Sequence, residues 1–219
     1  MGRGLHVLGG HAWPRPLAKN RMLLFPLAFV VGVSLGRLRG GRFQSLSALR
    51  LRATGLVVLA VIVQFGLGAV ASDAWRYVAL LASYAVTGIW LAINLRDGPN
   101  WRRGGLALVA AGYALNLLAI VPNGNMPVST DALRRAGGSE ASFEEKPNID
   151  KHVASSSDDV WPWLGDVIAV PPLRAVISVG DVAMLIGVVI VVCGGMTAVE
   201  PSLPRGRSCD GEAVEQDVA

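Results

Sequence analysis

The side chains of this chain that could form a catalytic or metal site lie between His152 and Asp181. His152 stands in a polar segment, and an imidazole titrates close to neutral pH, as a general base should. Asp166 and Asp181 offer the oxygen ligands that a divalent cation requires. Brought together, the three side chains would form a metal-assisted enzyme site with His152 as its catalytic candidate. The ordinary alternative is that a lone histidine in a loop is simply solvated.

Asp181 has a second interpretation, which is purely structural. Ser178 and Asp181 have the Ser-x-x-acid spacing of a helix capping box, with Ser178 as the N-cap and Asp181 at the third helical position. An acid there also faces the positive end of the helix dipole. Two interpretations therefore stand side by side: a capped helix, or a polar pocket in which Asp166 and Asp181 face each other and hold a cation or an ammonium group.

The stretch "PNGNMPVST", which begins at Pro122, follows a long uncharged run. Pro122 cannot continue a helical hydrogen-bond ladder, and the pair Asn123–Gly124 favours a turn because both residues tolerate positive φ. One interpretation is a helix stop followed by a tight turn. The other is a polar plug that folds back at the ends of membrane helices, where Asn123, Asn125 and Ser129 would bind a ligand.

The composition indicates a membrane protein. Of the 219 residues, 52% are hydrophobic and 16% are charged, with a mean hydropathy of +0.46, whereas a soluble domain carries about 25% charged residues. The net charge of +4 comes from arginines that cluster between apolar runs, where membrane orientation accounts for them, so we predict no nucleic-acid partner. The two cysteines make neither a disulfide framework nor a metal knuckle, and we predict no cofactor.

The apolar runs predict five membrane helices, since a bilayer core of about 30 Å needs about 20 apolar residues in a helix. The first run is short and spans only if its flanking Lys and Arg side chains reach the interfaces. The predicted helices are 22–36, 53–72, 77–95, 104–121 and 177–199. The fold class expected is thus an all-α integral membrane protein, a five-helix bundle with one long extracytoplasmic loop, 122–176.

Orientation follows from the arginines of the short loops. The loop after the first helix holds five arginines and the loop after the third holds three, so both are expected in the cytoplasm. This places the N-terminus outside and the C-terminus in the cytoplasm of a bacterial plasma membrane. The middle of the outer loop is predicted to lack fixed structure alone. Its later part is predicted to lie at the interface, with Trp161 and Trp163 at headgroup depth.

The two ends of the chain are interpreted separately from the membrane domain, 22–199. Residues 1–21 are polar, and Met22 would itself make a natural start codon, so we hypothesise that 1–21 reflects a misplaced gene start. Residues 200–219 are predicted to be a polar cytoplasmic tail.

The order of motifs resembles a family of small bacterial multi-pass membrane proteins catalogued as domain of unknown function 5317. The motifs are "GRLRGGR", "NGNMPVS", "KH", "WLGDVIAVP" and "SVGD", over roughly Met22 to Val199. The resemblance implies a fold, a membrane location and a set of polar motifs on the outer face, but no reaction. The residues it singles out are Asn123, Gly124, Met126, Pro127, Ser129, His152, Asp166, Ser178, Gly180 and Asp181.

Three functional hypotheses follow. The first is a non-enzymatic membrane protein whose outer polar cap binds a lipid headgroup, a small ligand or a partner; membrane lipids are its expected contacts. The second is a metal-assisted enzyme acting on a lipid-linked substrate at the outer face. The third is a small channel or transporter, although no helix core holds the ionisable groups that a proton relay requires. The usual enzyme sequence templates are absent.

Overall fold

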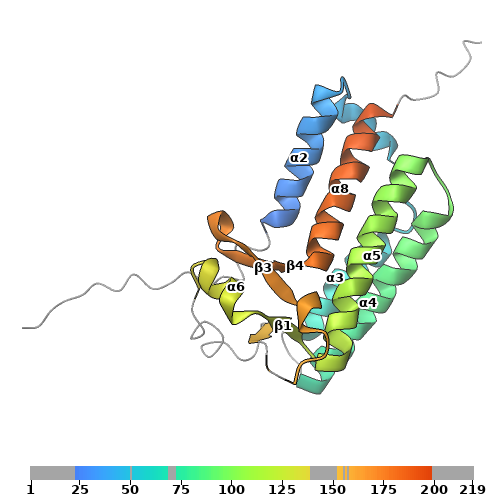
Figure 1. The fold of residues 1–219 in the computed structure, drawn as a ribbon. Coiled ribbons are helices and arrows are strands. Elements are labelled where there is room, and N and C mark those ends of the chain that lie inside the picture. The colour runs from blue at the N-terminus through green and yellow to red at the C-terminus, as the bar shows by residue number, and fades with distance from the viewer. Residues whose placement is uncertain are drawn as a thin grey trace, which may run out of the picture.

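Five apolar helices lie side by side, and a small β-sheet lies at one end of them (Figure 1). The computed structural model describes residues 23–49, 51–68, 73–138, 152–154, 156 and 158–198. The five helices, found at the five predicted places, are α2 (Leu24–Leu38), α3 (Gly55–Gly68), α4 (Asp73–Arg96), α5 (Asn100–Asn123) and α8 (Val179–Thr197).

Three of these helices, α4, α5 and α8, are long and apolar enough to cross a membrane by length and composition. Helix α2 and the described part of α3 are apolar but shorter. Mostly helical architecture is therefore confirmed, while five membrane crossings stay a prediction. Helices α4 and α5 extend a few residues beyond the predicted ranges at both ends, because polar residues continue the helices past the apolar runs.

Helix α5 ends close to where the sequence predicts. Pro122 is accommodated inside its last turn, and the helix stops at Asn123. Gly124 follows in the left-handed region, with φ of 70°, which glycine adopts at little cost. The chain thus turns at Gly124 as predicted, whereas Asn123, also expected in the turn, is still helical.

Helix α8 packs between α2 and α5, while α3 packs on α4 (Figure 1). Small residues allow the close approach of α5 and α8: a Cβ added to Gly112 would lie 2.2 Å from the Gly180 carbonyl oxygen, and one added to Gly187 would lie 2.6 Å from the Gly105 carbonyl oxygen. Glycine at these positions lets two backbones touch, as is common where helices pack in membranes.

The expectation of a purely helical fold is wrong for the predicted outer loop. The described residues of that region and the two that follow it form four short strands: β1 (Met126–Val128), β2 (His152–Ala154), β3 (Asp166–Val170) and β4 (Ala175–Ser178). Their order is β2-β1-β3-β4, with β1 parallel to β2 and to β3 and with β3 antiparallel to β4. The short helix α6 (Thr130–Arg135) packs on β3 and β4.

The hydrophobic pattern of a sequence does not easily distinguish a short strand from the apolar helix that follows it. Part of the segment assigned to the interface, "VIAV", is rich in β-branched residues and lies in β3. The 3-10 turns η2 (Pro162–Leu164) and η3 (Pro171–Leu173) flank this strand. The residues before Val179, assigned in part to the last helix, form β4. Behind the sheet, α6 buries its apolar face, and the core there consists of Val128, Ala132, Leu133, Ala136 and Val176.

The α5–α8 crossing makes a prediction about stability. Gly112→Ala should lower the free energy of unfolding by about 1–3 kcal/mol, because the new methyl group meets a backbone oxygen that cannot move without its helix. Gly104→Ala, in the same helix with no heavy atom within 4 Å of the place its new methyl group would take, is the matched control and should cost nothing. Thermal unfolding in mild detergent measures both; equal melting temperatures would contradict the crossing.

Candidate functional site

The sheet brings together segments that are distant in sequence. Strand β1 lies between β2 and β3, so that Met126 is opposite His152 and Val128 is opposite Asp166. Asp166 in turn pairs with Ser178 across the β3–β4 ladder. The segments that carry the sequence-predicted site residues are therefore neighbours at the sheet end of the bundle.

A buried polar cluster joins the sheet to the helices. Ser178 ends β4 and caps α8: its Oγ accepts a hydrogen bond from the Asp181 backbone N–H at 2.9 Å, and the Asp181 Oδ2 accepts from the Ser178 backbone N–H at 3.2 Å. The capping box predicted from the sequence is thus confirmed. Asp181 is 6% exposed and Ser178 is fully buried.

Asn116 of α5 completes this cluster. Its Nδ2 donates to the Asp181 Oδ1 at 2.9 Å, and its Oδ1 accepts from the Ser178 hydroxyl at 2.7 Å. The Asn116 side chain also requires a glycine at position 180, since a Cβ there would lie 2.1 Å from the Asn116 Oδ1. Both carboxylate oxygens of Asp181 therefore accept hydrogen bonds inside the protein. Sequence reasoning did not identify Asn116 as the partner of Asp181; its one signal was an amide in an apolar helix.

Asp166 is also buried, at 2% exposure, and its backbone oxygen accepts a hydrogen bond from the Ser129 N–H at 2.9 Å. Among the residues that the structure describes, no group of three or more His, Cys, Asp or Glu side chains is placed to hold a metal ion. His152 contributes its backbone to β2, and its side chain lies outside the described part of the chain. Binding by Asp166 or Asp181 and catalysis by His152 stay predictions.

Asn123 holds a distant loop against the end of α5. Its Oδ1 accepts from the Val160 N–H at 2.8 Å, and its Nδ2 donates to the carbonyl oxygens of Val160 at 2.9 Å and Ala119 at 2.7 Å. The other predicted ligand residues of this segment are also engaged. Asn125 donates to the Asn123 carbonyl at 3.0 Å, and Ser129 caps α6 by accepting from the Ala132 N–H at 3.3 Å.

The loop held by Asn123 presents aromatic side chains outward. Trp161 and Trp163 are 47% and 63% exposed, and Val160 beside them is 41% exposed. Next to them, Leu164 is buried in a core cluster with residues of α4 and α5. Trp161 has φ of 52°, a left-handed conformation that is uncommon for a bulky residue and is maintained only when the surroundings enforce it. We call Val160, Trp161 and Trp163 the tryptophan edge.

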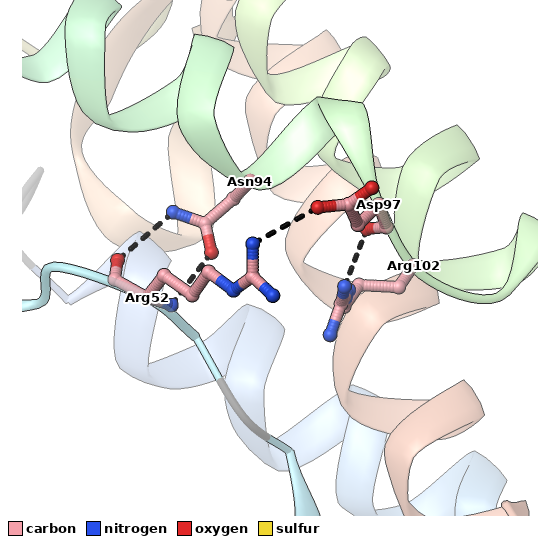
Figure 2. Close-up of polar contacts among 4 residues, drawn as sticks. All are labelled: Arg52, Asn94, Asp97 and Arg102. Atoms are coloured by element: carbon pink, nitrogen blue, oxygen red, sulfur yellow. Dashed lines mark hydrogen bonds and ion pairs between the residues drawn. The ribbon is translucent and has the colours of Figure 1, made fainter.

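At the opposite end of the bundle, another asparagine hydrogen-bonds the backbone of a neighbouring segment, as Asn123 does (Figure 2). Asn94 of α4, 2% exposed, accepts from the Arg52 backbone N–H at 2.8 Å and donates to the Arg52 carbonyl oxygen at 3.1 Å. Asp97 pairs with the Arg52 guanidinium at 2.9 Å, and its backbone oxygen accepts a hydrogen bond from Arg102. These contacts hold the segment between α2 and α3 to the turn between α4 and α5.

The buried cluster makes a testable prediction. Asn116→Ala and Asp181→Ala should each lower the free energy of unfolding by about 1–3 kcal/mol, because each leaves a buried partner unsatisfied. The double variant should lose about 0.5–3 kcal/mol less than the sum of the two losses. Denaturant unfolding in detergent measures the cycle. Asn116→Ala with Arg134→Gln, a distant exposed residue, is the additive control; additivity in both cycles would refute the Asn116–Asp181 bond.

Comparison with known proteins supports the resemblance drawn from the motifs. No curated protein and no solved structure shows a significant match to the chain. Residues 48–193, however, match the model described as "Family of unknown function (DUF5317)". The match takes in α3, α4, α5, the sheet, the tryptophan edge and most of α8. Because it extends over more than half of the residues, the chain belongs to this family of unknown function, DUF5317.

Proposed function

We propose that this chain is a multi-pass protein of the bacterial plasma membrane, with its N-terminus outside, its C-terminus in the cytoplasm and five helices in the bilayer. Three helices of sufficient length and apolarity support this proposal. The two arginine-rich segments also lie at the same end of the bundle, opposite the sheet (Figure 1). That arrangement is the one expected if both segments remain on the positive, cytoplasmic side.

We further propose that the sheet and α6 form a non-enzymatic outer cap, which binds a lipid headgroup, a small ligand or a partner. The polar residues first suggested as ligands support the fold of the cap, since Asn123, Ser129 and Asp181 all form hydrogen bonds within the protein. The tryptophan edge is the outward-facing feature. It is exposed, and Asn123 and the buried Leu164 hold it in position.

The lipid headgroup layer is the contact that this edge fits best. Tryptophan prefers the boundary between hydrocarbon and water, because its ring is apolar and its N–H is polar. The edge is attached to Asn123, the last residue of an apolar helix, and a helix in a bilayer ends near that boundary. The single observation that carries the proposal is therefore the exposed pair of tryptophans fixed at the end of α5.

A metal-assisted enzyme on a lipid-linked substrate is the second candidate. One observation favours it: β1 places the strand of His152 and the strand of Asp166 on its two sides. Asp181 favours it less, because both of its carboxylate oxygens already accept hydrogen bonds. If the chain is such an enzyme, a deletion strain should accumulate the lipid-linked substrate. Expression of the His152→Ala variant in that strain should then fail to remove the accumulated substrate. The binding cap predicts no such accumulation.

The proposed orientation can be tested with single cysteines. In a background with Cys193→Ala and Cys209→Ser, the variant Ser156→Cys should react with a membrane-impermeant maleimide in intact cells. Ser47→Cys, matched in residue type and also exposed, should react only after permeabilisation. Each site serves as the control for the other, and the reverse labelling pattern would invert the proposed topology.

The proposed lipid contact can be tested by fluorescence quenching in proteoliposomes. The difference in emission between the wild type and Trp161→Phe/Trp163→Phe isolates the tryptophan edge from the other tryptophans. We expect this difference to be quenched by phosphatidylcholine brominated close to the headgroup and much less by lipid brominated near the chain end. The control is the difference in emission between the wild type and Trp90→Phe, which isolates a tryptophan of α4 outside the edge.

Quenching of the difference emission by aqueous iodide, with no effect of either brominated lipid, would refute a headgroup contact. The edge would then face water and fit a soluble ligand or a partner. This outcome would leave the orientation of the helices unaffected, because the cysteine labels report on that independently.

A further inference from the structure

The end of the bundle opposite the sheet is strongly basic. Among the described residues, it carries one carboxylate, Asp97. The arginines there come from three places: the end of α2, the segment between α2 and α3, and the facing ends of α4 and α5. We call them the arginine face, and its members are Arg37, Arg39, Arg42, Arg52, Arg96, Arg102 and Arg103.

Internal contacts account for only part of this charge. Asp97 is already shared, since its carboxylate pairs with Arg52 and its backbone oxygen accepts from Arg102 (Figure 2). Arg39 donates a hydrogen bond to the Cys193 Sγ at 3.3 Å, and this contact does not neutralise the charge of the guanidinium group. Arg96 and Arg103 are exposed, and no described carboxylate pairs with either. A net positive surface therefore remains.

The position of these arginines suits a lipid headgroup. Arg96 is the last residue of α4, and Arg103 lies in the first turn of α5. Both helices are long and apolar enough to cross a bilayer, so their ends at this side would lie at the depth of the lipid phosphates. Guanidinium groups bind phosphate through paired hydrogen bonds as well as through charge.

The start of α5 adds a second reason to expect a negative partner. Acidic side chains are favoured in the first turn of a helix, because the helix dipole is positive there. Helix α5 has no acid in its first turn and no side-chain cap, and it places Arg102 and Arg103 there instead. This arrangement is electrostatically unfavourable in isolation, and an anionic group beside it would offset the cost.

We propose that the arginine face binds the headgroups of anionic phospholipids, of the phosphatidylglycerol type, in preference to zwitterionic phospholipids. The proposal rests on insertion of the helices into a membrane, as given under the proposed function, and does not depend on the tryptophan edge. A lipid is favoured over a soluble phosphate because the arginines lie at the ends of apolar helices, where acyl chains would pack.

The test uses the full-length protein in mild detergent, with phosphatidylglycerol or phosphatidylcholine added in increasing proportion. Phosphatidylglycerol should raise the melting temperature, whereas phosphatidylcholine should not, and added salt should weaken the effect. Arg96→Gln/Arg103→Gln should reduce the apparent affinity for phosphatidylglycerol by about 25-fold, since each arginine near an anionic surface contributes about fivefold. Arg134→Gln/Arg135→Gln removes the same charge from α6 at the sheet end, away from the arginine face, and should lower the affinity far less.

Three results would overturn the proposal: equal stabilisation by phosphatidylcholine, equal loss in the two double variants, or full reproduction of the effect by glycerol phosphate, which would indicate a soluble anion. Arg42→Gln, on a separate segment, gives a second variant if the first does not fold, and about a fivefold loss is expected from it. A failed phosphatidylglycerol effect would leave the brominated-lipid result intact, so the two proposals fail separately.

Discussion

A buried carboxylate at the start of α8 is the constraint on which the rest of this structure depends. Asp181 is removed from water, and an unpaired charge there would be very costly. It is satisfied from two sides, by the Ser178 backbone N–H within its own helix cap and by the Asn116 amide of α5. Because Ser178 is also the last residue of β4, one cluster fixes α8, α5 and the sheet relative to one another.

The helix crossing and this cluster require each other. The Gly112–Gly180 approach brings the two backbones into contact, and that closeness lets the Asn116 side chain reach Ser178 and Asp181. A larger residue at Gly180 would occupy the position of the Asn116 oxygen. Packing between apolar helices in lipid has no hydrophobic driving force, so close contact and hydrogen bonds of this kind determine which faces meet.

At each end of the bundle, an asparagine side chain supplies hydrogen-bond partners for the backbone of a loop residue. Loop backbone near the end of an apolar helix must find partners for its N–H and C=O groups. Asn123 satisfies both groups of Val160 at the sheet end, and Asn94 satisfies both groups of Arg52 at the other. With the loops held in this way, the tryptophan edge and the arginine face become defined surfaces, one at each end.

The sequence by itself determined the features that depend on nearby residues. The positions of the five apolar helices follow from run lengths, the capping box follows from the Ser178–Asp181 spacing, and the turn at Gly124 follows from its lack of a side chain. The family could also be recognised from the order of its motifs. Only the tertiary structure decided that the outer segment forms a sheet, with β1 between β2 and β3, and that Asn116 is the partner of Asp181. Parallel pairing and helix crossing join residues far apart in the chain, and no local pattern of side chains specifies which distant partner will meet them.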